Sequence, residues 1–377
     1  MRRISQFLIL FLIAVGLTTA PSFAQVGITS VPFLQIEPDS RAAGMGNSGV
    51  AIADNASAVF WNPAGLAWQT DSQISITHAN WLPGFNADLF YDYLVGSYHV
   101  EGIGTFGGHI TFLNLGEQLR TDETGLELGN FRSYELAGGI SYGYAFNERW
   151  SVGTGLRFIY SSLADGQLST GESINPGSSI AADFGFMYRS NPFSFGPGES
   201  QLRAGMNLSN IGSGISYTDD ADDDPLPTIF RAGWAFKMDL DADGVNTLTF
   251  SNDFSKVMAR TEEVVADGDT TFQAMSVGKA LFRSWDTLER FDGTEMIELN
   301  LLEQLMIGLG LEYWYNNQFA LRTGYYYENP NNGNREFLTF GAGIRYSMFG
   351  VDFSYLYTLE EDHPLANTMR FSLLLNF

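Results

Sequence analysis

Residues 150–161 read WSVGTGLRFIYS, and their side chains alternate between two kinds. The even positions are mostly apolar or aromatic, from Trp150 to Tyr160, whereas the odd positions are mostly small or polar and include Arg157. Successive side chains of a β-strand point to opposite faces, so the stretch predicts a strand with one apolar and one polar face. This pattern is typical of a strand that lies between membrane lipid and a polar barrel interior.

The same alternation recurs along the chain and decides the fold class. It appears at 184–189, 230–237, 319–325 and 351–355, where aromatic side chains alternate with small or charged ones. A soluble β-sandwich can alternate too, but it buries its aromatic face against a second sheet and needs fewer long strands. Aromatic residues make up 14% of the chain, which suits the aromatic belts of a membrane barrel. We therefore predict an all-β protein, a transmembrane antiparallel β-barrel.

Turn residues divide the chain into about fourteen strands, an even number as bacterial barrels require. The approximate spans are 72–82, 87–100, 103–115, 131–146, 149–163, 177–190, 201–210, 228–239, 246–256, 303–315, 318–328, 335–347, 350–358 and 368–377. Short and long connections alternate, so we expect periplasmic turns, extracellular loops and both termini in the periplasm. The longest loop, 257–302, includes a stretch from Phe272 to Leu288 whose composition favours helix.

The start of the chain has the features of a secretory signal peptide. Arg2 and Arg3 precede an apolar run over 7–17, and residues 22–24 form a small-x-small cleavage site. A membrane anchor would need roughly 20 apolar residues. The absence of Cys excludes a lipoprotein anchor, disulfides and thiol catalysis. We expect three parts: a signal peptide at 1–24, a plug segment at 25–70 and a barrel at 71–377.

The charge balance and two acidic runs bear on possible ligands. A formal net charge of -23 repels phosphates and excludes nucleic acid as a partner. Residues 239–244 begin like a calcium loop, but Phe250 stands where the bidentate Glu belongs, so we interpret them as a turn. The run 219–224 is expected at a solvated loop tip, where it could hold a cation only loosely. We predict no metal site and no cofactor.

The last strand carries a distinctive pattern. Its apolar side chains share one face and end on an aromatic residue: Phe371, Leu373, Leu375 and Phe377. A soluble edge strand that ended in this way would be an aggregation hazard. The pattern is similar to the terminal signal by which outer-membrane barrels are recognised for insertion.

The segment before the first strand is rich in small residues. Gly and Ala at this density let a backbone fold tightly in a confined space, and Asn-Pro favours a turn. The segment precedes the first strand on the periplasmic side, from where it can enter the lumen as a plug. The residues that we assign to this plug are Gly44, Gly46, Gly49, Asn62, Pro63, Ala64 and Gly65.

Alternation also places charged side chains inside the barrel. The predicted lumen charges are Arg157, Asp183, Arg189, Arg231, Arg322 and Asp352. Charges in a confined space need partners. We therefore predict inter-strand ion pairs that grip the plug.

Several segments resemble a known family. The stretch GMGNSGVAIADNASAVFWNPAGLA from Gly44 looks like the N-terminal hatch of FadL-type outer-membrane transport proteins. Within that group the chain resembles the PorV family of the type IX secretion system. The similarity is carried by VPFLQIEPDSRAAGMG from Val31, LSNIGSGISYTD from Leu208, LEYWYNNQFALRTGYYYE from Leu311 and HPLANTMRFSLLLNF from His363. PorQ-type relatives share the hatch, so the hatch alone does not separate the two.

The resemblance implies a fourteen-stranded barrel in the outer-membrane lipid that shuttles secreted cargo. In that family, cargo crosses the membrane through a giant translocon. The PorV-like barrel receives the C-terminal domain of the cargo and carries it to a surface attachment complex. One alternative is a FadL-like transporter of hydrophobic molecules, which needs an apolar path through the lumen.

A minor alternative is a lipid A deacylase, because PorV-like proteins are linked to lipopolysaccharide deacylation. A catalytic His would have to pair with a nucleophile and an acid. Only His363 is predicted in an external loop, whereas His78, His99 and His109 are predicted on strands, and none has a nucleophile motif beside it. We therefore predict no catalytic residues and a protein that is not an enzyme.

Overall fold

The computed structural model describes residues 29–85, 87–121, 126–164, 166–167, 173–218, 223–266, 269–291, 296–360 and 363–377. The predicted signal peptide therefore lies outside the described residues, and so does most of the acidic run 219–224. Within the described ranges no helix is long and apolar enough to span a membrane.

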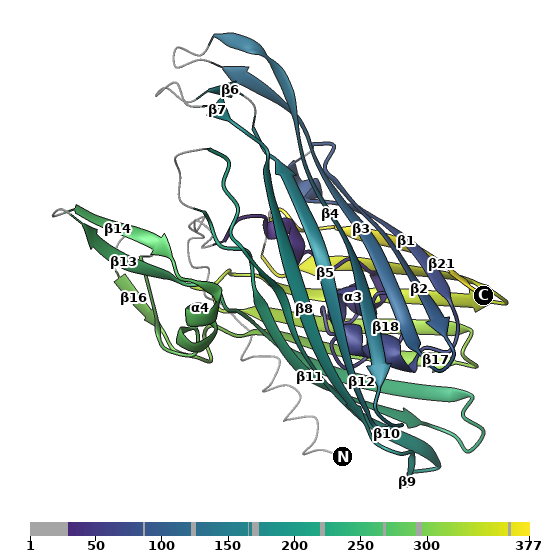
Figure 1. Ribbon diagram of the computed structural model, residues 1–377. Helices are drawn as coiled ribbons and strands as arrows, with labels where there is room; N and C mark the ends of the chain where they lie inside the picture. Colours follow the sequence, from purple (N-terminus) through teal and green to yellow (C-terminus); the bar gives the residue numbers. More distant parts are fainter. Residues whose placement is uncertain are drawn as a thin grey trace, which may run out of the picture.

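Fourteen antiparallel strands form a closed barrel, which confirms the predicted fold class (Figure 1). They are β1 (Gln73–Asn80), β2 (Phe90–Val100), β3 (Gly104–Thr121), β4 (Glu127–Ala145), β5 (Trp150–Ser162), β8 (Gly177–Arg189), β10 (Gly198–Gly212), β11 (Ile229–Asp239), β12 (Asn246–Val257), β17 (Met306–Tyr315), β18 (Phe319–Glu328), β19 (Glu336–Tyr346), β20 (Phe349–Thr358) and β21 (Met369–Asn376). The barrel closes where β1 pairs with β21, with Ile76 opposite Leu373. Closure removes the open edges that would otherwise expose unpaired backbone groups.

The connections differ strongly between the two ends of the barrel. One end, which we call the turn end, carries short turns such as 146–149, 316–318 and 347–348. The last residue also lies there, because Ser72 and Phe377 exchange backbone hydrogen bonds of 3.0 and 2.9 Å. The opposite end, which we call the loop end, carries the long connections, including 258–305.

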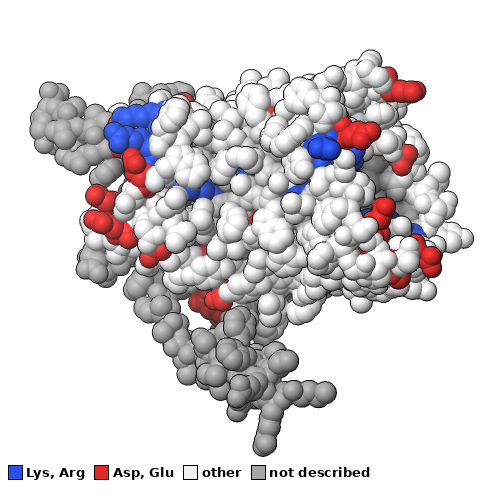
Figure 2. Space-filling model, turned by 90° about the horizontal axis from the view of Figure 1, so that it is seen from below, with Lys and Arg blue, Asp and Glu red and all other residues white. Residues whose placement is uncertain are grey.

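Burial follows the alternation that the sequence shows. In β5, Trp150, Leu156 and Phe158 are exposed on the outside, whereas Arg157 and Ile159 are buried inside. The face drawn in Figure 2 has its charged side chains mostly toward the two ends, with a broad and largely uncharged band between them. This band is the surface that a barrel presents to lipid.

Two strands run further than expected. Residues 116–130 were predicted as a loop, but β3 and β4 continue through most of them as a paired extension. Gly116, with a φ of 77°, lies at a register shift between Asn114 and Glu117. The turn-like residues at this point therefore mark a β-bulge within the ladder and not the end of the strand.

The loop end has secondary structure of its own. The long connection forms the hairpin β13 (Thr261–Ala266) and β14 (Asp269–Ala274), then α4 (Val277–Arg283), then β15 (Leu288–Phe291) and β16 (Met296–Leu299). The predicted helix over 272–288 is thus shorter than expected, because its first residues pair as a strand with 261–263. Further short elements are β6 (Gly166–Gln167), β7 (Ser173–Ile174), η3 (Pro83–Phe85) and, at the turn end, β9 (Phe193–Phe195).

Residues 29–72, which we call the N-terminal segment, lie within the barrel. They form η1 (Pro32–Gln35), α2 (Ser40–Ala43), α3 (Ala58–Trp61) and η2 (Pro63–Trp68). These elements contact β3, β4, β5, β8, β19, β20 and β21 from the inside, and Figure 1 shows α3 between the walls of the barrel. Most of their side chains are buried.

Candidate functional site: the filled lumen and the loop-end rim

Glycines allow the N-terminal segment and the barrel wall to approach closely. A Cβ on Gly324 of β18 would lie 2.0 Å from the Gly46 nitrogen, and one on Gly46 would lie 2.4 Å from the Leu309 oxygen. Gly46 also has a φ of 62°, which glycine adopts without strain. Gly44 lies beside Gly341, where its Cβ would be 3.2 Å from the Gly341 Cα. Backbone thus faces backbone along this side of the lumen.

Two polar side chains anchor the segment at buried positions. Asp253 of β12 accepts hydrogen bonds from the Gly49 and Val50 amides at 2.7 and 2.8 Å and from the Ser48 hydroxyl at 3.1 Å. Asn62 is fully buried, and its amide group donates to the carbonyls of Phe186 and Met206 at 3.1 and 3.2 Å. Asp253 therefore satisfies backbone amides of the segment, and Asn62 in turn bonds to backbone carbonyls of the barrel wall.

The residues that follow Asn62 sit against small residues of the wall. The Ala64 carbonyl accepts a hydrogen bond from the Ser151 hydroxyl at 2.9 Å, and its amide donates to the Asn62 side chain at 3.1 Å. Pro63 lies against Gly153, whose Cβ would come within 2.2 Å of the Pro63 carbonyl carbon. Gly65 packs on Ala53 within the segment itself.

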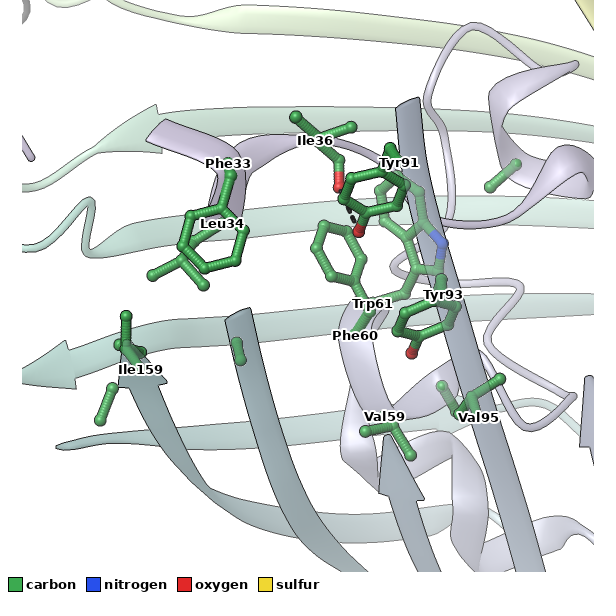
Figure 3. Close-up of a cluster of buried hydrophobic side chains, with 14 of the residues drawn as sticks. Phe33, Leu34, Ile36, Val59, Phe60, Trp61, Tyr91, Tyr93, Val95 and Ile159 are labelled. Atoms are coloured by element: carbon green, nitrogen blue, oxygen red, sulfur yellow. Dashed lines mark hydrogen bonds between the residues drawn. The ribbon is translucent and has the colours of Figure 1, made fainter. Parts of the chain in front are cut away.

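An apolar cluster joins the segment to β2. Phe33, Phe60 and Trp61 of the segment share this cluster with the inward side chains of β2, and Figure 3 shows Trp61 beside Tyr91 and Tyr93, with Phe33 further along next to Leu34. The Tyr91 hydroxyl donates to the Ile36 carbonyl at 3.4 Å, while the Trp61 indole N–H donates to Asp39 at 2.6 Å. The polar atoms of Trp61 and Tyr91 are thus paired while their rings stay buried, whereas the buried Tyr93 hydroxyl has no hydrogen-bond partner within the described residues.

The predicted lumen charges form two groups and leave two members apart. Arg157 pairs with Asp183 at 2.8 Å, and Asp183 also accepts the Asn210 amide at 2.7 Å. Arg322 pairs with Asp352 at 2.8 Å. These pairs are almost fully buried, so each charge is compensated where water is absent.

Neither Arg231 nor Arg189 has an ion pair within the described part of the chain. Arg231 lies 5.1 Å from the Phe60 ring centre and donates to the Ser209 hydroxyl at 3.1 Å. Arg189 lies 4.6 Å from the Trp68 ring centre and donates to a backbone carbonyl at 2.7 Å. The aromatic face of the segment takes the place of a carboxylate at both positions.

The ion pairs that reach the segment involve residues that the sequence analysis missed. Glu312 of β17 accepts from Arg41 of α2 at 2.8 and 2.9 Å and from Arg322 at 2.7 Å. Arg41 also pairs with Asp54, which pairs in turn with Arg203 at 2.8 Å. A signal was available for Glu312, because it shares the inward face of β17 with Gly308 and Gly310.

The residues of the predicted insertion signal line the seam of the barrel. Phe371, Leu373 and Phe377 are exposed on the outer face, at 50%, 56% and 59%, and Leu375 is half-buried. Leu375 and Leu373 lie opposite Ile74 and Ile76 of β1.

At the loop end, a pocket of about 370 Å³ opens between two connections, and we call it the rim pocket. Its walls come from 212–214, 223–228, 258–259 and 273–281, and they include Leu226, Met258, Met275 and Ala280. Below it, the long connection is fastened by buried Arg260, whose guanidinium donates to the carbonyls of Ser284 and Asp286 and to Gln304. One wall of the pocket is therefore a connection that buried hydrogen bonds hold to the barrel end.

The contacts around His363 and around the acidic turn 240–245 bear on the catalytic and cation-binding alternatives. The His363 Nδ1 accepts the Leu365 amide at 3.1 Å, and burial lowers the pKa of this ring. Across the described ranges no hydroxyl or carboxylate bonds to it, and no group of metal-ligating side chains occurs. Asp241, in the acidic turn 240–245, accepts the Val245 and Asn246 amides at 2.8 and 3.1 Å and closes the hairpin.

Comparison with known proteins places this geometry in context. A family model described as type IX secretion system protein PorV matches residues 21–264. The match ends inside the long connection, so the segments quoted from Leu311 and His363 lie outside it. No curated protein matches the chain.

Solved structures share the barrel fold at low sequence identity. The Pseudomonas putida toluene transporter TodX is 13% identical with a TM-score of 0.49, and 90% of this chain and 97% of that chain are covered. The TodX deltaS2S3 mutant, a monoaromatic hydrocarbon channel, is 11% identical with a TM-score of 0.52, at 89% and 97% coverage. The Ralstonia pickettii toluene transporter TbuX is 13% identical with a TM-score of 0.48, at 90% and 97% coverage.

The family match and the barrel agree with each other. Outer-membrane barrels direct their short turns to the periplasm and their long loops to the outside, which assigns the turn end and the loop end. A match over more than half of the chain, on a closed barrel of FadL-like fold, identifies this outer-membrane protein as a member of the PorV family of type IX secretion system proteins.

Proposed function

We propose that the protein receives the C-terminal domain of secreted cargo at the loop end and carries it from the translocon to the surface attachment complex. Membership of the PorV family links the chain to type IX secretion. The observation that carries the finer proposal is the rim pocket, a structured recess on the side of the membrane where cargo would emerge.

The filled lumen supports a role at the surface over a role as a pore. The N-terminal segment meets the wall through backbone contacts at Gly46 and Gly324 and through the buried anchors Asp253 and Asn62. Opening a path would leave these buried donors and acceptors unpaired, which costs about 1–3 kcal/mol for each group. We therefore assign residues 25–70 the role of a plug.

The chemistry of the rim pocket suits a peptide partner. Met258 and Met275 are flexible and polarisable, and such side chains adapt to varied apolar surfaces. The backbone of 212–214 and the carboxylate of Asp223 lie at the same recess. The pocket can accept one or two side chains from an extended segment, while the surrounding loops contact the rest of the domain.

The test fills the pocket without disturbing the barrel. We expect Ala274→Trp to weaken binding of a purified cargo C-terminal domain about tenfold, because the new ring occupies the recess. Gly278→Trp is the matched control, since a Cβ on Gly278 of α4 meets open space. Both variants should run as folded barrels in unheated electrophoresis.

The same variants should differ in cells. In a strain that lacks the native chain, the Gly278 variant should restore display of cargo on the surface and the Ala274 variant should not. Equal binding by both variants, with secretion intact after removal of 258–305, would refute docking through this loop.

A second function has one observation in its favour. A monoaromatic hydrocarbon channel shares the barrel fold, and the lumen of this chain holds a buried aromatic cluster around Trp61 and Tyr91. A transporter of hydrophobic molecules would bind toluene inside the barrel. Uptake of labelled toluene by vesicles that carry the barrel, lost when Gly107 is changed to Leu beside Val59, would favour this alternative over the shuttle.

A further inference from the structure

The turn end holds a polar recess of about 240 Å³ that no role has yet been given, and we call it the vestibule. It lies between the N-terminal segment and the inward side chains of the strand ends. Its lining includes the cations Arg41, Arg203, Lys237 and Arg345, the carboxylates Asp54 and Glu312, and the polar or aromatic side chains Asn55, Gln73, Thr249, Asn317 and Trp314.

The two carboxylates are already engaged. Arg41 bridges Asp54 and Glu312, and Arg203 pairs with the second oxygen of Asp54 at 2.8 Å. Arg345 pairs at 2.6 Å with Asp352, which lies behind the vestibule. The cations of the lining therefore outnumber its carboxylates.

Lys237 is the cation left over. Within the described ranges its ammonium group has no hydrogen bond or ion pair, although the residue is half-buried on the inward face of β11. Its strand neighbours at this level are Gln201 and Thr249, which are uncharged. An ammonium held partly out of water without a carboxylate gains from an anion that enters the recess.

An aromatic wall adds a second means of recognition. The Trp314 ring lies 5.3 Å from the Arg345 guanidinium and 5.4 Å from that of Arg322. The ring is thus held in place by charged neighbours and offers an apolar surface next to the cations. Asn55 and Asn317 add amide groups, which suit the polar groups of a peptide backbone.

The sign of the vestibule is opposite to that of the whole chain. The net charge of -23 would repel an acidic partner at long range, but such repulsion is screened over a Debye length of about 8–10 Å. The acidic loops of the far end lie beyond the membrane thickness of roughly 30 Å. At the turn end itself, Asp239, Asp241 and Asp243 follow Lys237 along the chain, but they are not part of the lining, in which four cations stand against two carboxylates. Inside the recess a ligand therefore meets an excess of positive charge.

We propose that the vestibule binds an acidic peptide segment presented from the periplasm, with a carboxylate on Lys237 and adjoining peptide groups near Asn55 and Trp314. A recess of about 240 Å³ admits one or two side chains and excludes a folded domain. This site lies at the end opposite to the rim pocket and does not rest on the shuttle function.

The test uses the full-length barrel in detergent, which exposes both ends. We expect a fluorescein-labelled tetraglutamate peptide to bind, measured by anisotropy, and a tetraglutamine peptide to bind at least tenfold more weakly. Lys237→Gln should weaken tetraglutamate binding about tenfold, the effect of one lost charge-assisted contact. Lys237→Arg should retain it.

Arg149→Gln is the matched control, because Arg149 is an exposed cation at the same end but outside the vestibule. It should leave tetraglutamate affinity within twofold of the native value. Equal losses in the Lys237 and Arg149 variants would overturn the proposal, since general charge would then explain binding. Displacement by inorganic phosphate as effective as that by unlabelled tetraglutamate would also overturn it, because the site would not select peptides.

Discussion

At the scale of single residues, the closest contact between the N-terminal segment and the wall depends on Gly324. A Cβ there would lie 2.0 Å from the Gly46 nitrogen and 2.2 Å from the Met45 carbonyl carbon. Both neighbours are backbone, so no side chain can rotate away. We expect Gly324→Ala to lower the free energy of unfolding by about 1–3 kcal/mol, as overpacking does, measured by urea titration of Trp fluorescence.

Gly138→Ala serves as the comparison for this prediction. Gly138 is also a strand glycine, but its Cβ would have the His109 carbonyl oxygen at 3.7 Å, an ordinary contact. The change should be neutral within about 0.5 kcal/mol. Equal stability of the two variants would show that the segment is not seated against β18 as the structure has it.

The sequence predicts which side of the barrel wall a side chain faces, but not which other side chain it contacts. Alternation is local, so the inward positions of Arg157, Asp183, Arg322 and Asp352 could be derived from their own strands. Which groups meet depends on the stagger between strands and on the path of the segment, and both are non-local. For this reason Arg41 and its contact with Glu312 were missed.

At the scale of elements, the strands were the most predictable part and the long connection the least. All fourteen predicted spans overlap the observed strands, because period-two alternation and turn residues both mark them. The helix over 272–288 was overestimated since its first residues have a strand partner at 261–263, and pairing outweighs a weak helix preference. Composition alone does not contain that pairing.

The N-terminal segment should loosen in acid. Burial would raise the pKa of Asp54, but the charges of Arg41 and Arg203 outweigh it and lower this pKa to about 2. A carboxylate with a depressed pKa stabilises the folded state above its unfolded value of about 3.9, and that stabilisation is lost as pH falls toward 2. We expect pepsin to cut within 29–70 faster in Asp54→Asn than in the native chain at pH 4.

The two cleavage rates should converge near pH 2, where native Asp54 takes up its proton. The ratio of the variant's cleavage rate to that of the native chain is compared at each pH, because pepsin's own pH dependence affects both rates equally and cancels. Asp71→Asn is the control, because Asp71 is exposed and forms no ion pair within the described ranges. A ratio that stays constant from pH 4 to pH 2 would contradict the ion pairs of Asp54 with Arg41 of the segment and Arg203 of β10.

At the scale of the whole molecule, a change at Phe377 can distinguish an effect on insertion into the membrane from an effect on the stability of the folded barrel. Phe377 closes the barrel through its backbone, which bonds to Ser72, while its ring is 59% exposed. Removing the ring should therefore cost the finished barrel little. Because the ring belongs to the predicted insertion signal, we expect Phe377→Ser to lower the amount of folded barrel in the outer membrane several-fold.

Phe349 offers a matched exposed ring. It lies at the same end on β20, opposite Leu375, and is also 59% exposed. Phe349→Ser should insert normally, and both variants refolded from urea into detergent should show the same unfolding midpoint, because neither ring is buried. Equal accumulation of the two variants in cells would remove Phe377 from the insertion signal, whereas a lower midpoint for Phe377→Ser alone would make its role structural.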